Sequence, residues 1–235
     1  MPNHPLPEIV AHRGASRDRP ENTLAAFALA LDQGADAIEL DVHATRDGVV
    51  VVHHDPVLHA PAQPPDRRPR IAEITHAELR ALAPDGDTGI PTLAEVLELV
   101  GTRARVYVEI KGRAVERQVL DVLRDGRTDC AVHAFDHRVP QRVRALAPGV
   151  PVGILLTSYL LDVAAAVRPV PARDVWQDWT LIDDAWVAAV RAVGGRSVAW
   201  TVNDPAAGVA LARLGVEALC TDVPGLMRAA LAAAL

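Results

Sequence analysis

The sequence predicts an α/β protein with the (β/α)8 barrel fold, in a single domain that spans residues 1–235. The chain is long enough for one large domain, and 50% of its residues are hydrophobic. Short runs rich in β-branched residues alternate with segments rich in alanine and leucine, as in proteins built from repeated βα units. From residue 105 onward the strand-like runs recur roughly every 20–25 residues, the length of a compact βα unit. An open doubly wound sheet is the alternative arrangement.

Eight segments have the composition of barrel strands. Each is short, rich in strand-forming residues, and bounded by turn-forming or helical sequence. They are residues 8–12, 37–42, 105–111, 130–135, 150–156, 174–179, 196–202 and 217–222. Eight βα units in about 250 residues is the size of a typical (β/α)8 barrel.

Two helix starts support this frame. Thr92 is followed three residues later by Glu95, which predicts a capping box at the start of a helix. Farther along, Asp204 stands at a helix N-cap, with Pro205 in the first turn and Gly215 just past the end. Both helices precede a predicted strand, as a barrel requires.

One interval departs from the regular spacing. Between the strands at 37–42 and 105–111 lie the sequence VVVVHHDP and a run rich in proline and arginine. We therefore expect a small insertion between the second and third barrel strands, at approximately 55–91. Residues 59–70 form either an exposed loop or a lid over the catalytic end of the barrel.

Charge and composition exclude several classes of protein. The net charge of −6 argues against a nucleic-acid binder, which would normally show a basic face. The amino terminus lacks the pattern of a signal peptide, and no apolar run approaches the roughly 18 residues of a membrane span. We expect a soluble cytoplasmic protein with no stable membrane insertion. Cys130 and Cys220 lie in apolar runs and are expected to be buried free thiols.

Charged and imidazole side chains gather at the ends of predicted strands, where a barrel enzyme has its active site. These residues are His12, Arg13, Glu39, Asp41, Glu109 and Lys111. Each alone has a structural explanation, such as a local ion pair, but burying several charges together costs several kcal/mol each. Three converging carboxylates favour a hard divalent cation, Mg²⁺ or Ca²⁺ with Mn²⁺ as an alternative, over zinc.

Several motifs occur together in one order along the chain: HRG, PENTLAAF, GADAIELDVHATRDGVVVVHHDP, IPTLAEVL, VEIKG, AWTVNDP and LGVEALCTDVP. In this series the sequence closely resembles the glycerophosphodiester phosphodiesterases, whose barrel is like that of phosphatidylinositol phospholipase C. The resemblance implies metal-dependent hydrolysis of glycerophosphodiesters to glycerol 3-phosphate and an alcohol. Glycerophosphocholine and glycerophosphoethanolamine are the expected substrates.

The resemblance also implies roles for individual residues. His12 and His54 become the general acid and base, and Glu39, Asp41 and Glu109 become the metal ligands. Arg13 and Lys111 become phosphate contacts, Arg with a donor fork that matches phosphate oxygens. Trp200 either lines the substrate pocket or packs in the core. The attacking oxygen is either the substrate's own glycerol hydroxyl or water.

The adjacent histidines in VVVVHHDP have different expected roles. Neighbouring side chains of a strand point to opposite faces, so His53 and His54 cannot do the same job. The resemblance places the catalytic imidazole directly before Asp-Pro, which makes it His54 and leaves His53 structural. Asp55 is expected to orient the turn with Pro56.

Three departures from the family pattern bear on the leaving alcohol: the VLHAPAQPPDRR run after HDP, Ala134 before Phe-Asp, and the VWQDW strand. Apart from these departures, a lysophospholipase D-like activity on single-chain lipids is the rival enzyme hypothesis, and it requires an exposed apolar rim. A non-catalytic barrel that only binds a phosphodiester is the alternative outside enzymes. A monomer and a homodimer both remain open.

Overall fold

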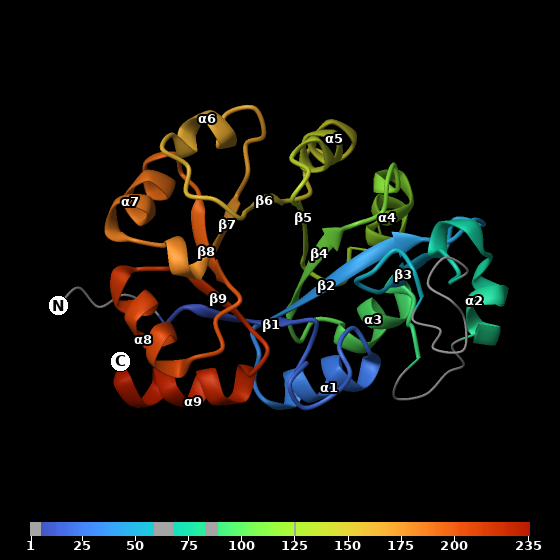
Figure 1. The fold of residues 1–235 in the computed structure, drawn as a ribbon, viewed down its shortest axis with the longest axis horizontal. Helices are drawn as coiled ribbons and strands as arrows, with labels where there is room; N and C mark the ends of the chain where they lie inside the picture. Colours follow the sequence, from blue (N-terminus) through green and yellow to red (C-terminus); the bar gives the residue numbers. More distant parts are fainter. Residues whose placement is uncertain (1–5, 59–67, 83–88, 125) are drawn as a thin grey trace.

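A computed structural model describes residues 6–58, 68–82, 89–124 and 126–235. Eight parallel strands of this part of the chain form a closed barrel inside a ring of helices (Figure 1). The barrel strands are β1 (Glu8–His12), β2 (Ala37–Ala44), β4 (Arg105–Ile110), β5 (Cys130–Ala134), β6 (Val152–Leu156), β7 (Asp174–Asp178), β8 (Arg196–Trp200) and β9 (Ala218–Thr221). The predicted (β/α)8 fold is confirmed, and each predicted strand overlaps one of these eight.

Closure excludes the open doubly wound sheet. Strand β1 pairs in parallel with β9 on one side and with β2 on the other. Val10 illustrates this, because its register partners are Cys220 in β9 and Ala37 in β2. The other parallel strands also pair on both sides, in the order β1-β9-β8-β7-β6-β5-β4-β2 and back to β1, so none of the eight is left at an edge and the sheet is closed.

The helices of the outer ring follow the strands in order. They are α1 (Leu24–Asp32), α3 (Leu93–Val100), α4 (Glu116–Leu123), α5 (Arg138–Leu146), α6 (Val163–Val167), α7 (Asp184–Ala192), α8 (Pro205–Leu214) and α9 (Pro224–Ala234). Thr92 and Glu95 form the predicted capping box at the start of α3. Asp204 caps α8, Pro205 begins it, and Gly215 ends it in a left-handed conformation, as the sequence predicts.

Two apolar layers hold the barrel together. The larger layer fills the space between the strands and the helices. A smaller cluster fills the barrel interior, with Tyr107, Leu155 and Trp176 as its largest members. Strand β2 is buried along its whole length because it carries one layer on each face.

The chain between β2 and α3 leaves the barrel pattern, as expected of an insertion. Strand β3 (Val50–Val52) pairs antiparallel with β2, and a 3-10 turn (Ile71–Glu73) and α2 (His76–Leu82) follow. This part has its own small apolar cluster, made of Val51, Leu58, Ile71, Leu79 and Ile90. The prediction of a loop or lid at 59–70 falls mainly on 59–67, outside the described residues.

Both cysteines are free, as predicted; Cys220 is buried and Cys130 is partly buried. Among the described residues, no helix is long and apolar enough to cross a bilayer.

The turn after β1 depends on one glycine. Gly14 has φ +87°, and a Cβ atom there would lie 2.7 Å from the backbone carbon of Ala26 in α1. The close approach of backbone to helix fixes the path of the preceding residue, Arg13, which itself has φ 56°. A residue with a side chain at position 14 would push the turn away from α1.

We predict that Gly14→Ala lowers the free energy of unfolding by about 2–4 kcal/mol, through left-handed strain plus overpacking. Gly48→Ala is the matched control, because Gly48 has φ +85° but nothing within 4 Å of its Cβ position. It should cost only the strain, about 1–2 kcal/mol. Urea unfolding of the two variants measures the difference, and equal losses would contradict the steric account.

Candidate active site

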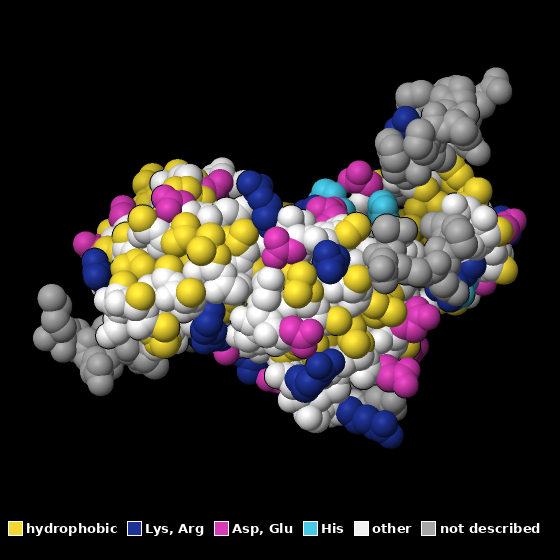
Figure 2. Space-filling model, turned by 90° about the horizontal axis from the view of Figure 1, so that it is seen from below, with side chains coloured by type: hydrophobic (Ala, Val, Ile, Leu, Met, Phe, Trp, Pro, Cys, Tyr) yellow, Lys and Arg dark blue, Asp and Glu magenta, His cyan; other side chains and the backbone are white. Residues whose placement is uncertain are grey.

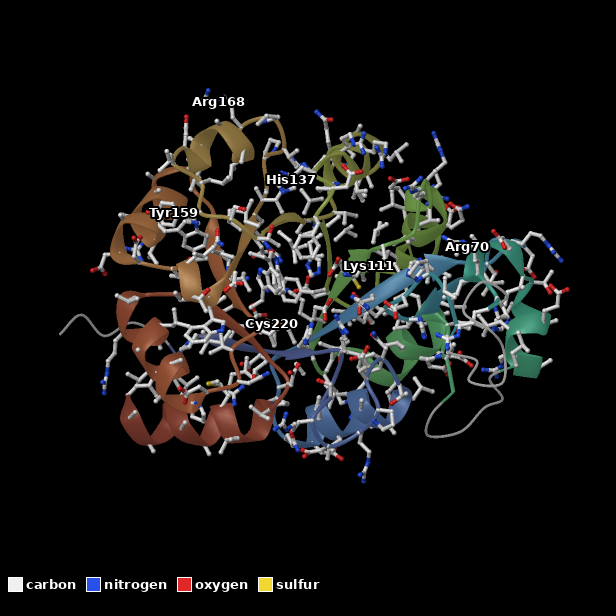
Figure 3. All side chains as sticks on the ribbon, in the orientation of Figure 1. Arg70, Lys111, His137, Tyr159, Arg168 and Cys220 are labelled. Carbon is white, nitrogen blue, oxygen red and sulfur yellow. The ribbon has the colours of Figure 1, made fainter. Side chains whose placement is uncertain are left out.

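A pocket of about 210 Å³ opens at the carboxyl ends of the barrel strands. Figure 2 shows histidine, acidic and basic side chains together along the upper edge of that view, where the surface is hollowed. In Figure 3 the labelled Lys111 and Cys220 lie toward the centre of the ring, whereas Arg70, Tyr159 and Arg168 lie around it. The lining residues are His12, Arg13, Glu39, His54, Glu109, Lys111, His133, Phe135, Leu155, Trp176, Trp200 and Cys220.

The sequence-predicted site residues therefore meet at one place. All of them line this pocket except Asp41, which is fully buried beside it. Strand parity explains the convergence, because Glu39 and Asp41 stand two residues apart on β2 and share one face. Register aligns Asp41 with Glu109 of β4, which brings the three carboxylates together.

Cations surround Asp41. Its Oδ2 lies 3.1 Å from Nε of Arg13, and its Oδ1 lies 3.4 Å from Nζ of Lys111. The side-chain amide of Asn22 also donates to Oδ2, at 2.9 Å. Burial raises the pKa of the Asp41 carboxyl, but Arg13 and Lys111 outweigh burial and hold the pKa below its ordinary value. Asp41 is therefore an ionised carboxylate.

Glu109 behaves differently although Lys111 lies close to it. The Nζ atom of Lys111 is 2.6 Å from Oε1 of Glu109. Burial nevertheless raises the pKa of Glu109, and the nearby charges of Asp41 and Glu39 add to that rise. The carboxylates outnumber the cations that face them, so this part of the site favours additional positive charge.

Arg13 is held by three different neighbours. Its backbone N–H donates to the backbone oxygen of Glu39, at 2.9 Å, and its Nη1 donates to Glu21, at 2.9 Å. Its backbone carbonyl accepts from the N–H of Asn22, at 3.0 Å. Glu21 and Asn22 therefore brace this turn. Thr23 caps the helix α1 that follows.

Glu39, Glu109 and His133 form a cluster that could hold a metal ion. One ligand atom from each lies within 4.8 Å of the other two, and all three residues are buried. Neither ring nitrogen of His133 has a hydrogen-bond partner among the described residues. Carboxylate oxygens together with an unpaired imidazole suit a divalent cation. Asp41 lies outside this cluster, and its assignment as a ligand stays a prediction.

His12 is oriented by a carboxylate from the other end of the chain. Its Nδ1 donates to Oδ1 of Asp222, at 2.7 Å. Ser16 and Asn203 also donate to Asp222, at 3.1 and 2.6 Å, and hold the carboxylate in place. Burial lowers the pKa of His12, but the Asp222 hydrogen bond and the charge of Glu39 raise it above 6.5 overall. The arrangement leaves Nε2 of His12 for the pocket.

The hairpin of β2 and β3 brings His54 back to the barrel mouth. The backbone N–H of His53 donates to the backbone oxygen of Asp41, at 2.9 Å. The Nε2 of His43 donates to the backbone oxygen of His54, at 3.0 Å. Nδ1 of His54 donates to Oδ1 of Asp55, at 2.9 Å. His53 bonds the Asp55 carbonyl instead and does not line the pocket. Both histidines lie past the end of β3 at Val52, so strand alternation does not apply to them, and their different roles stay a prediction.

Aromatic rings form one wall of the pocket. Trp200 and Phe135 meet edge to face, with centroids 5.4 Å apart. The Nζ atom of Lys111 lies 5.4 Å from the Phe135 centroid, a cation–π contact that helps to place the ammonium group. Trp200 lines the pocket and also packs against the interior apolar cluster, and its contact with substrate stays a prediction.

Sequence reasoning missed Asp222 and His133, although a signal existed for each. Asp222 stands two residues after Cys220, a pocket residue, and His133 stands two before Phe135. Strand parity could therefore have placed both toward the barrel axis. Strand parity does not predict that the barrel closes between its first and last strands, and this closure places Asp222 beside His12.

The sequence matches the profile of the Glycerophosphoryl diester phosphodiesterase family over residues 12–226. The chain belongs to this family. The "Probable glycerophosphodiester phosphodiesterase 1" of Mycobacterium tuberculosis is 33% identical, over 87% of this chain and 84% of that protein. The "Glycerophosphodiester phosphodiesterase" of Caldanaerobacter subterraneus is 29% identical, over 92% of this chain and 94% of that protein. Family membership makes this glycerophosphodiester phosphodiesterase a phosphoric diester hydrolase.

Solved structures of the family superimpose closely on this one. An Oleispira antarctica phosphodiesterase in complex with its product sn-glycerol-3-phosphate gives a TM-score of 0.86 with 26% identity, over 97% of each chain. A glycerophosphodiester phosphodiesterase from Agrobacterium tumefaciens gives 0.81 with 29% identity, over 95% of this chain and 99% of the other.

We predict that Asp222→Asn lowers the pKa of His12, because the neutral amide no longer stabilises the imidazolium ion. NMR titration of the histidines in EDTA-treated protein measures the change.

The raised pKa of His12 also makes stability depend on pH. Protonated His12 stabilises the fold fully below pH 6.5, and this stabilisation is lost as the pH rises through the folded-state pKa of His12. Asp55→Asn is the control and should leave His12 unchanged. An unaltered His12 pKa in Asp222→Asn would refute the assignment.

Proposed function

We propose that the protein hydrolyses glycerophosphodiesters, such as glycerophosphocholine or glycerophosphoethanolamine, to glycerol 3-phosphate and an alcohol. The single observation that carries this proposal is the pocket itself, where His12 and His54 face a buried cluster of carboxylates and two cations. A phosphodiester requires charge neutralisation, a base for the attacking oxygen and an acid for the leaving alkoxide.

His12 and His54 divide the two proton transfers. Each has its Nδ1 bonded to a carboxylate, Asp222 for His12 and Asp55 for His54, so each presents Nε2 as its remaining nitrogen. One imidazole takes the proton of the attacking hydroxyl, which belongs to water or to the glycerol of the substrate. The other gives its proton to the alkoxide as the P–O bond breaks. The raised pKa of His12 suits it to hold the proton that is donated.

Arg13 and Lys111 bind the phosphate oxygens in this proposal. Both line the pocket, and both are held by Asp41, so their positions are set before substrate arrives. Burial lowers the pKa of Lys111, but the charges of Glu109 and Asp41 outweigh burial and raise it, so the amine stays protonated. The Trp200 ring would cover the glycerol carbons.

A divalent cation completes the site in this account. Glu39 and Glu109, with Asp41 as the third expected ligand, would hold it, and the carboxylates alone favour Mg²⁺ or Ca²⁺, with Mn²⁺ as an alternative. When bound, the cation supplies positive charge that stabilises the phosphodiester and its transition state. The surplus of carboxylates over cations around Glu109 supports this requirement.

Single-chain lysophospholipids are the second candidate substrates. The observation in their favour is a set of exposed apolar residues on the segments that follow β5 and β6: Phe135, Tyr159 and Leu161, the last 98% exposed. The small pocket favours the deacylated diesters instead, because about 210 Å³ holds little more than a glycerophosphate group.

A coupled glycerol 3-phosphate assay tests the proposed function. We predict turnover of the deacylated diesters in the presence of a divalent cation, and loss of turnover in EDTA that the added cation restores. Parallel reactions with lysophosphatidylcholine separate the second candidate; they are followed by the release of choline, because the other product would be lysophosphatidic acid rather than glycerol 3-phosphate. If glycerol 3-phosphate is released as fast in EDTA as with the added cation, the metal requirement is ruled out. If no diester releases glycerol 3-phosphate, the result supports a barrel that only binds a phosphodiester.

Exchange of the histidines tests their roles. We predict that His12→Ala and His54→Asn each lower kcat by about 10²–10⁴-fold, the usual contribution of a general acid or base. The matched control is His53→Asn, which changes the neighbouring side chain and should keep most activity. Circular dichroism confirms the fold of each variant. Equal losses in His53→Asn and His54→Asn would contradict the division of labour between them.

A further inference from the structure

The imidazole of His133 lies beside the buried carboxylates of Glu39 and Glu109. His133 is 1% exposed and lies in register with Glu109 on one side and with Gly153 on the other. Its side chain lines the pocket, as does that of Phe135, which directly follows the end of β5. None of the roles proposed for the acid, the base or the phosphate contacts uses this side chain.

The His133 ring is held rigidly by its neighbours. The edge of Trp176 meets it with centroids 4.4 Å apart, and Tyr107 stacks on it at 6.1 Å. Gly153 allows the close approach of these side chains, since a Cβ atom there would lie 3.0 Å from Nε1 of Trp176 and 3.2 Å from the Cβ of His133. A buried histidine in such a clamp normally satisfies its nitrogens with hydrogen bonds.

His133 does not do so within the described part of the chain. Both of its ring nitrogens are buried and without a hydrogen-bond partner. The nearest acidic atom is Oε1 of Glu39, 3.7 Å from Nε2, which is too far for a hydrogen bond. Two ligands of one ion, each at about 2.1–2.3 Å, stand about 3–4.5 Å apart. The spacing thus fits two ligands that share a cation.

We propose that His133 is a nitrogen ligand of the divalent cation, together with the carboxylates of Glu39 and Glu109. An imidazole in the ligand set gives an advantage to first-row transition ions over Mg²⁺ and Ca²⁺, which prefer oxygen. The inference rests on the proposed metal-dependent reaction and names the ion class that this site selects. It revises the hard-ion expectation, which considered carboxylates alone.

Electron spin echo envelope modulation of the protein loaded with Mn²⁺ alone tests the proposal without any turnover. We expect nitrogen modulation from a coordinated imidazole, and its loss in His133→Gln. His137→Gln is the matched control, because that imidazole bonds the backbone of Leu155 and does not line the pocket. Calorimetry should show Mn²⁺ affinity about tenfold or more weaker in His133→Gln, and Mg²⁺ affinity changed by less than about threefold.

Two further variants keep the test decisive if His133→Gln fails to fold. His12→Gln and His54→Gln remove the other imidazoles of the pocket, and nitrogen modulation should survive in both. Three results would overturn the proposal. They are no nitrogen modulation in the wild type, nitrogen modulation that persists in folded His133→Gln, and loss of the modulation in His12→Gln or His54→Gln. These outcomes are independent of the proposed function, whose own failure is the absence of glycerol 3-phosphate in the assay.

Discussion

The burial of negative charge at one end of the barrel is the constraint on which the rest of the site depends. Glu39, Asp41 and Glu109 are each at most 5% exposed, and a barrel interior cannot hold ionised carboxylates without positive charge nearby. Arg13 and Lys111 are the cations that face them. The two cations hold the pKa of Asp41 below its ordinary value, whereas burial and the neighbouring carboxylates raise the pKa of Glu109. The same imbalance favours an additional cation at this end of the barrel.

The rigid parts of the fold maintain this arrangement. Below the pocket, the apolar interior cluster supports the side chains that point upward from the strands. Around it, turns with unusual backbone conformation set the direction of two site residues: Arg13 has φ 56° and Asn22 has φ 58°. Such conformations persist where surrounding contacts over-determine them, here the hydrogen bonds to Glu39 and Asp41. The positions of the site side chains are therefore set by contacts outside the pocket.

Barrel closure assembles residues that are far apart in the sequence. His12 ends the first strand and Asp222 follows the last, yet pairing of β1 with β9 places them in hydrogen-bond contact. The β2–β3 hairpin solves a similar problem for His54, which reaches the mouth from the insertion rather than from a barrel strand. Two imidazoles thus approach one pocket from separate elements, and each has its own carboxylate.

The barrel, its strands and the charged residues at the strand ends could be predicted from local pattern, whereas the choice of His54 and the roles of the pocket residues came from the family resemblance. Alternation puts Glu39 and Asp41 on one face of β2, and their places near strand ends predict that they meet Glu109 at the same end of a barrel. The role of Asp222 depends on closure, and the separation of Asp41 from the Glu39–Glu109–His133 cluster depends on which cations reach each carboxylate. Those are three-dimensional facts that no spacing in the chain encodes. His133 was hidden for another reason, since a single histidine within an apolar strand resembles a core residue.

Anomalous diffraction from crystals grown with Mn²⁺ is the most direct test of the central claim that the buried carboxylates form a cation site. The account predicts one strong peak between the carboxylates of Glu39 and Glu109, within coordination distance of the His133 ring, with Lys111 displaced from its 2.6 Å contact with Glu109 or shared with it. A map with no peak in the pocket, and with the Lys111–Glu109 contact unchanged, would show that the protein neutralises these charges alone and would contradict the account.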